Sequence, residues 1–183
     1  MDPIKKISMK AHFFLGLIIA TVVCLGVVVI GAFGVEATWP AFFVMISFFI
    51  TGANIKNLPN IFIGCITGLI LAFLLLIAAT PVMAAIGPTI GLLALVWIVV
   101  FLIVFGQEFL PQAFNNFAFV YFTIALIFAG EAATMTPAAI VSEYVTWALT
   151  AILGGGGILA CIIGGITLAR KAGLIPPADA SGH

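Results

Sequence analysis

Six apolar segments, separated by short polar stretches that contain glycine or proline, constrain the fold of this chain more than any other feature. They cover residues 11–33, 39–53, 59–79, 87–106, 114–130 and 140–169. Hydrophobic residues make up 64% of the 183 residues and charged residues only 7%, whereas about a quarter of a soluble domain is charged. Lipid is therefore the expected solvent for most of the surface, and the lipid bilayer is the expected partner.

The lengths of these segments predict an all-α integral membrane protein. A spanning helix needs roughly 20 apolar residues, which four segments reach and residues 39–53 and 114–130 do not. Unpaired backbone groups are not tolerated in lipid, so all six segments are predicted to be helices. The first apolar run is longer than the core of a typical signal peptide, about 7 to 15 residues, and is expected to stay as the first span. The tail 172–183 is expected to be disordered.

Basic residues predict the orientation of these spans. They precede the first span, lie between the second and third, and follow the sixth: Lys5, Lys6, Lys10, Lys56, Arg170 and Lys171. Six spans place all of them on one side, which the positive-inside rule makes cytoplasmic. The chain is thus predicted to lie in a bacterial inner membrane with both termini in the cytoplasm, residues 1–10 included.

The two halves of the chain repeat the same order of elements. Residues 11–82 and 87–171 each read as a full span, a short aromatic-rich helix, a glycine, six further residues, a proline and a long helix. The marking pairs are Gly52 with Pro59 and Gly130 with Pro137. Three spans per unit invert the second unit, so a 3+3 inverted repeat with two short helices is predicted, and such repeats place binding sites near the midplane. Chance agreement between apolar helices is the alternative.

The first Gly-to-Pro loop is unusually rich in polar side chains. Thr51, Asn54, Asn57 and Asn60 lie in or beside it, after a segment that spans only about 22 Å at 1.5 Å per residue. Two interpretations remain open. The loop lies below the headgroups and lines a solute path with its amides, or it is an ordinary cytoplasmic turn made of turn-forming residues.

The second unit supplies acidic candidates for the same path. Glu131 and Thr134 lie in the second Gly-to-Pro loop, and Glu143 lies near the start of the sixth span. A carboxylate inside a membrane is costly and tends to face a polar interior. The alternative places these glutamates at the outer interface, where Glu36 and Trp39 are also expected.

Aromatic side chains crowd the short helices and could form an apolar constriction in the path. The candidates are Phe48, Phe49, Tyr121 and Phe128. Apolar rings in small-solute channels exclude hydrated ions. Lipid contact is the alternative for most of them.

Small residues mark two helix faces. Gly64 and Gly68 form a GxxxG motif in the third span, and four glycines follow one another in the sixth: Gly154, Gly155, Gly156 and Gly157. Such faces serve close helix packing or a seam between subunits of a homo-oligomer, here a dimer or trimer. Adjacent glycines also weaken a helix, so a kink or an unwound turn is expected in the sixth span.

The stretches "TWPAFFVMISFFITGANIKNLPNIFIG" and "FAFVYFTIALIFAG" resemble a family of small bacterial inner-membrane proteins typified by YcdZ. The matching residues are Trp39, Phe48, Phe49, Gly52, Phe128 and Gly130. The resemblance spans most of the chain and implies an integral membrane protein. Where that family often has a glycine-rich first turn, this chain has "GANIKNLPN", so no shared substrate is implied.

No Walker, redox or catalytic motif is present, so the sequence does not predict an enzyme, and no cofactor is expected. The three cysteines are far apart and lack metal-ligand spacing, and a formal net charge of zero gives no basic patch for nucleic acid. We predict a channel or facilitator for a small polar solute of the urea, amide, ammonia or small weak-acid class. The alternative is a non-transporting subunit that assembles with or regulates a larger membrane complex.

Overall fold

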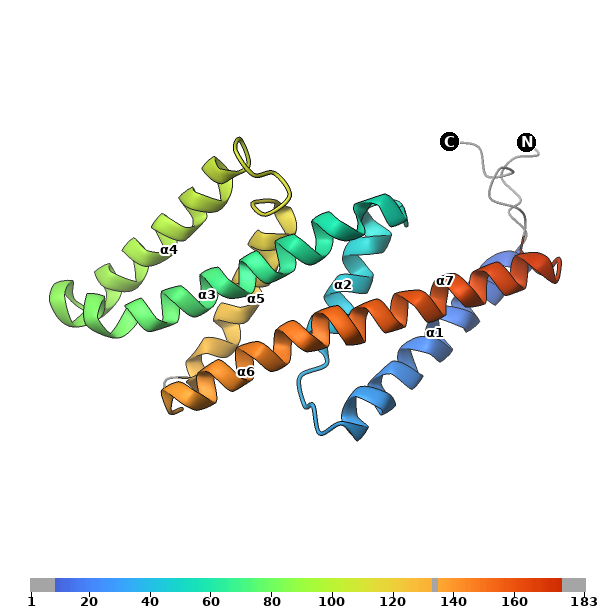
Figure 1. The fold of residues 1–183 in the computed structure, drawn as a ribbon, viewed down its shortest axis with the longest axis horizontal. Coiled ribbons are helices and arrows are strands. Elements are labelled where there is room, and N and C mark those ends of the chain that lie inside the picture. The colour runs from blue at the N-terminus through green and yellow to red at the C-terminus, as the bar shows by residue number, and fades with distance from the viewer. Residues whose placement is uncertain (1–8, 133–134, 176–183) are drawn as a thin grey trace.

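The computed structural model describes the backbone of residues 9–132 and 135–175, and their side chains apart from Lys10 and residues 128–132. Every regular element in this part of the chain is helical (Figure 1). In order they are α1 (Met9–Ala32), α2 (Trp39–Ile50), a 3₁₀ turn (Ile55–Asn57), α3 (Leu58–Ile86), α4 (Pro88–Gly106), α5 (Asn116–Ala132), α6 (Pro137–Leu149), a π-helical segment (Thr150–Gly155) and α7 (Gly156–Lys171). The predicted all-helical class is confirmed for these residues, whereas most of the tail 172–183 lies outside them.

Four stretches of helix are long and apolar enough to cross a membrane: Ala11–Ala32, Ile55–Ile86, Pro88–Gly106 and Pro137–Lys171. The helix α2 has only 12 residues, about 18 Å at 1.5 Å per residue, and α5 has 17. The segment with the four glycines does not break the last helix, which runs through α6 and α7 without interruption. The sequence predicts a kink or an unwound turn at the four glycines. The structure has a π-helical segment there, which includes Gly154 and Gly155.

Contacts at glycines fix the relative direction of the helices. Gly26 of α1 faces Ile158 of α7, and Gly165 of α7 faces Ile18, so these two helices are antiparallel. Gly64 and Gly68 of α3 face Asn115 and then Ala118, so α3 and α5 are parallel. The parallel direction of helices two apart in the chain is what alternating crossings of a membrane produce.

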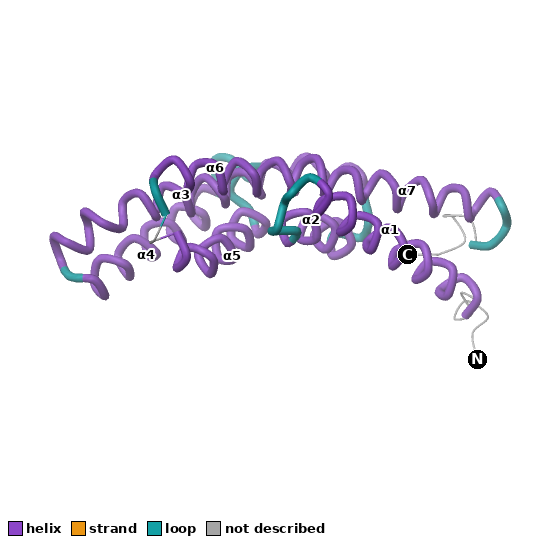
Figure 2. The backbone as a smooth tube through the Cα atoms, turned by 90° about the horizontal axis from the view of Figure 1, so that it is seen from below, coloured by secondary structure: helices purple, strands orange, loops and turns teal. Residues whose placement is uncertain are grey.

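The helices form two packing groups. In the first group α4 and α5 pack on α3, and in the second group α1 and α2 pack on the rod made by α6, the π segment and α7. Figure 1 shows α3 and the α6–α7 rod as two long helices, with α4 beside one and α1 beside the other. Figure 2 shows the helices from below as a thin arched layer. The chain passes between the groups at the α2–α3 and α5–α6 connections.

Aromatic residues of α5 form the centre of the core. Tyr121 and Phe122 are fully buried, and the Tyr121 hydroxyl donates a hydrogen bond of 2.7 Å to the carbonyl oxygen of Pro40. The acceptor lies in the first turn of α2, where a carbonyl can accept this bond in addition to the bond within the helix. This bond joins α5 of the first packing group to α2 of the second.

Candidate functional site

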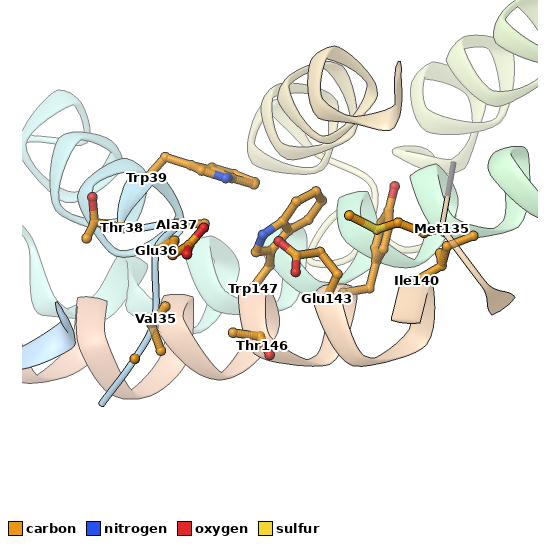
Figure 3. Close-up of a pocket in the computed structure, with 12 residues that line it drawn as sticks. Val35, Glu36, Ala37, Thr38, Trp39, Met135, Ile140, Glu143, Thr146 and Trp147 are labelled. Carbon is orange, nitrogen blue, oxygen red and sulfur yellow. The ribbon is translucent and has the colours of Figure 1, made fainter. Parts of the chain in front are cut away.

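A cavity of about 520 Å³ lies between the α1–α2 loop and α6, and we call it the glutamate cavity. It is lined by Gly34, Val35, Glu36, Ala37, Thr38, Trp39, Met135, Ile140, Glu143, Tyr144, Thr146 and Trp147. Figure 3 shows Glu36 on the loop and Glu143 on α6 among the side chains that line the cavity. The lining therefore carries two carboxylates and no basic side chain.

Three aromatic side chains form a wall of the glutamate cavity. Trp147 lies 5.3 Å from Trp39 and 4.8 Å from Tyr144, measured between ring centroids. Trp39 was expected at the lipid interface, but its ring is half-buried and also packs against Tyr121 at 5.8 Å. The Trp39 indole packs inward because Tyr121 of α5 and Trp147 of α6 lie beside it in the folded chain. The sequence of a single span does not reveal these neighbours.

The hydroxyl of Tyr144 is buried and has no hydrogen-bond partner among the described residues. The Tyr144 side chain is 7% exposed, and it lines the glutamate cavity. A buried hydroxyl without a partner is uncommon and destabilising, and this oxygen is enclosed rather than open to the cavity. Within residues 9–132 and 135–175, no three His, Cys, Asp or Glu side chains come together as a metal site would require.

A second cavity, of about 280 Å³, lies between the α2–α3 connection and the α4–α5 loop, and we call it the amide cavity. Its lining is Thr51, Asn57, Asn60, Pro111, Asn115, Asn116 and Phe117. Three of the predicted path residues, Thr51, Asn57 and Asn60, are thus brought together here. The lining carries four asparagines and no charged side chain.

Local hydrogen bonds shape the Gly-to-Pro loop beside the amide cavity. The side-chain NH₂ group of Asn57 donates a hydrogen bond to the backbone carbonyl of Thr51 at 3.2 Å. The Thr51 hydroxyl donates to the backbone carbonyl of Ser47 at 3.0 Å. Asn54, also predicted in the path, is exposed and does not line the cavity. Its side-chain oxygen instead accepts a 3.0 Å bond from the Lys56 amide and begins the 3₁₀ turn. Asn54 thus has the turn-forming role, and its neighbours face the cavity.

Asn115 and Asn116 were not among the predicted path residues. The Asn115 side-chain oxygen accepts bonds from the amides of Phe117 and Ala118 at 2.9 and 3.1 Å, so it caps α5. Its NH₂ group donates to the Asn60 carbonyl at 3.1 Å and so links the α4–α5 loop to α3. An asparagine just before an apolar helix is an N-cap signal, which the sequence contains. The contact of Asn115 with α3 depends on how the helices pack, so the residues around Asn115 in the sequence do not predict it.

Aromatic side chains lie between the linings of the two cavities. Phe117 lines the amide cavity, and Tyr121, one turn further along α5, contacts Trp39 of the glutamate cavity. Tyr121 also packs against Phe43 at 6.3 Å between ring centroids. We call Trp39, Phe43, Tyr121 and Trp147 the aromatic layer. Of these four residues, Phe43 and Tyr121 line neither cavity.

The remaining predicted constriction and path residues lie elsewhere. Phe48 is buried, Phe49 is half-buried, and their rings pack against each other at 5.7 Å without lining either cavity. Of the predicted constriction residues, only Tyr121 belongs to the aromatic layer. Thr134 and the side chains of Phe128 and Glu131 lie outside the described part of the structure.

The glycine faces are used for packing within the chain. A side chain at Gly68 would collide with α5, one at Gly64 would collide with Asn115 just before α5, and one at Gly155 would meet Val44 of α2 at 2.8 Å. Gly154 faces Ile30 and Ala41 at 3.1 and 3.3 Å. A side chain at Gly156 would touch only Phe62, at 3.6 Å, and one at Gly157 would meet nothing within 4 Å. The sequence leaves two uses open for these glycines, helix packing within the chain or a seam between subunits. Close packing within the chain accounts for Gly64, Gly68, Gly154 and Gly155.

No family model, curated protein or solved structure matches the chain.

Proposed function

We propose that the protein is a channel or facilitator for a small polar solute, with no catalytic activity. The observation that carries this proposal is the pair of cavities with polar side chains in their linings, with aromatic side chains of α2 and α5 between them. The glutamate cavity is one mouth of the path, the amide cavity is the other, and the aromatic layer is its closed constriction. Solutes that hydrogen-bond to amides, such as urea, short amides, ammonia or small weak acids, remain the proposed class.

The inverted repeat, with units 11–82 and 87–171, is part of this proposal. The same sequence offset that separates Gly52 from Gly130 and Pro59 from Pro137 also relates the linings of the two cavities. It pairs Ala37 with Asn115, Thr38 with Asn116, Trp39 with Phe117 and Asn57 with Met135, and all eight residues line one cavity or the other. The two mouths thus occupy equivalent positions in the two units, which supports the repeat.

A ring contact in the aromatic layer supports a two-fold axis between the units. Phe43 and Tyr121 are separated by the same offset, and their rings pack against each other. A residue contacts its own equivalent only close to a two-fold axis. The packing groups agree with this symmetry, because α1 packs on the last helix of the second unit and α4 on the last helix of the first. The axis would thus pass through the constriction.

The closed aromatic layer is also what the rival function predicts. A non-transporting subunit needs no path, and Tyr121 at the centre of the layer is fully buried. A non-transporting subunit also needs a surface that contacts its partner. Trp97, Phe101 and Phe105 form an exposed stacked row on α4 that could serve as this surface. Flux measurements separate the two functions.

Asn60→Leu is expected to lower the flux of the transported solute about fivefold in proteoliposomes, the equivalent of one hydrogen bond of about 1 kcal/mol. The Asn60 side chain lines the amide cavity, and its loss removes a contact with the solute without breaking a bond within the described chain. The measurement is a flux screen of the reconstituted parent over neutral solutes, weak acids and ions, repeated with the variant.

Asn54→Leu is the matched control, because it removes the same amide from the same loop outside the cavity. Its flux should equal that of the parent. Equal flux for all three proteins would remove the amide cavity from the path. No flux of any solute with the parent would favour the non-transporting subunit.

We further propose that the protein lies in the inner membrane with the amide cavity toward the cytoplasm. The described basic side chains Lys56, Arg170 and Lys171 support this orientation through the positive-inside rule. In a variant with Cys24, Cys65 and Cys161 replaced by alanine, Thr89→Cys at the start of α4 should react with an impermeant maleimide added to intact cells. Asn54→Cys should react only after permeabilisation. The reverse labelling pattern would invert the proposed topology.

Membership of the YcdZ family and assembly as a dimer or trimer remain proposals. The resemblance at Trp39, Phe48 and Gly52 supports the first. For the second, Gly157 is the member of the four-glycine run that leaves open space for another helix.

A further inference from the structure

We propose that the π segment and the four glycines that overlap it form a swivel, at which α6 and α7 turn against each other about the axis of the rod. The π segment is Thr150–Gly155 and the glycines are residues 154–157, so the swivel is residues 150–157. The helix runs through these residues without a break. This inference does not rest on transport, although Trp147 of the aromatic layer lies just before the swivel.

The π segment sets the rotation of α7 relative to α6. A turn closed by i→i+5 bonds holds about one residue more than an α-helical turn, so it turns α7 back by roughly 100°. On an uninterrupted α-helix, Trp147 and Ile158 would lie within about 20° of each other. In the structure Trp147 packs in the cluster that contains residues of α3 and α5, whereas Ile158 packs with Ile30 of α1 and Ala41 of α2. Closing the π turn into α-helix therefore changes which way one of these two faces points.

The four glycines leave this part of the rod without side chains on any side. An α-helical turn has about 3.6 residues, so four successive glycines cover a whole turn. Packing requires only two of them, because a Cβ at Gly155 would lie 2.8 Å from Val44 and one at Gly154 would lie 3.1 Å from an α1 side chain. Gly156 and Gly157 have room for a methyl group, and as glycines they weaken the helix. Rotation of this turn against α2 explains them, because it brings them to the crowded side.

Helix α7 is held in place, whereas α6 has space beside it. Close contacts at Gly26 and Gly165 hold α7 against α1 at two levels. Helix α6 lines both the glutamate cavity, of about 520 Å³, and an apolar groove of about 200 Å³ that it forms with α3. The buried hydroxyl of Tyr144 on α6, which lacks a partner among the described residues, destabilises the present orientation of α6. We therefore assign the turning to α6, which carries Trp147 away from Trp39.

Distances between spin labels on the full-length protein in nanodiscs test the swivel. With the three native cysteines replaced by alanine, Val28→Cys on α1 and Val145→Cys on α6 carry the labels, and both positions are exposed. A turn of roughly 100° moves a side chain at the helix surface by about 8 Å, so double electron–electron resonance should show two distance populations. Val28→Cys with Leu168→Cys on α7 is the matched control, and it should show one population because α1 and α7 stay together.

Two variants should leave only the distance population of the present arrangement. Deletion of Leu153, which is 69% exposed, removes the extra residue, so α-helical bonds can close without turning α6. The double variant Gly156→Ala with Gly157→Ala adds methyl groups that fit here and would strike α2 in the turned arrangement. Gly16→Ala on α1, where a methyl group also meets nothing within 4 Å, should keep both populations.

One distance population for the α1–α6 pair in the otherwise unchanged protein would overturn the swivel. Two populations for the α1–α7 pair would also overturn it, because the motion would then belong to α1. If the deletion and the double alanine variant both kept two populations, neither the extra residue nor the glycines would be the pivot, and the swivel would be rejected. Flux does not enter this test, so the swivel and the transport function stand or fall separately.

Discussion

Gly68→Ala should be the most destabilising single-methyl substitution among the helix-packing glycines. A Cβ at Gly68 would overlap the carbonyl oxygen of Ala118 and approach the backbone nitrogen of Phe122 to 2.9 Å. Backbone atoms of α5 cannot rotate away as a side chain can, so α3 and α5 must separate. Overpacking of this kind costs about 1–3 kcal/mol, and separation of the helices also disturbs the cap at Asn115. Reversible unfolding in mixed micelles, followed by circular dichroism, measures the loss.

Gly157→Ala provides the matched control in another long helix. A methyl group there would meet nothing within 4 Å, so the intrinsic preference for alanine in a helix should make the change neutral or stabilising by up to about 1 kcal/mol. Equal stability of the two variants would show that α5 does not pack on α3 as described. Strong destabilisation by Gly157→Ala would indicate instead that another subunit occupies the open space.

Tyr121→Ala should raise the flux of small polar solutes about tenfold, which corresponds to a barrier lower by about 1.4 kcal/mol. Tyr121 is fully buried at the centre of the aromatic layer, and we expect the space left by its ring to connect the two cavities. The hydroxyl bond to Pro40 is lost as well, so α5 is no longer tied to the start of α2. Stopped-flow shrinkage of proteoliposomes measures the flux.

Two substitutions separate opening of the path from general loosening. Tyr121→Phe removes the hydrogen bond but keeps the ring, and it should raise flux far less than the alanine variant. Phe101→Ala removes an equally large ring from the exposed face of α4 and should leave flux at the parental value. If Phe101→Ala leaks as much as Tyr121→Ala, the aromatic layer is not the barrier.

The helices were predictable because each is specified by its own residues. Apolar runs long enough to cross lipid gave α1, α3, α4 and the α6–α7 rod, and the shortness of α2 and α5 follows from the polar residues and glycines beside them. The continuation of α3 to Ile86, past the predicted end at residue 79, is the largest difference. Pro81 lies inside α3, because neighbouring helices allow proline inside a membrane helix.

Which side chains face one another was less predictable, because packing decides it. Asn54 and Asn57 look equivalent in the sequence, yet one begins a turn and the other lines a cavity. Trp39 reads as an interface anchor until Tyr121 and Trp147 are brought beside it. Asn115 lies in the α4–α5 loop, and its contact with Gly64 and its hydrogen bond to the Asn60 carbonyl, both in α3, place it in the amide cavity.

The two packing groups give the Gly-to-Pro loops a mechanical meaning. The repeated units do not coincide with the packing groups, because α1 and α2 pack with the second long helix while α4 and α5 pack on α3. If one packing group moved as a body against the other, the chain would bend at two hinges, the connections α2–α3 and α5–α6. In the first hinge Gly52 and Ala53 have φ values of 78° and 55°, and the alanine stores strain that a small rotation can release. Such a rotation would act directly on Tyr121 and Pro40, whose hydrogen bond crosses from one body to the other.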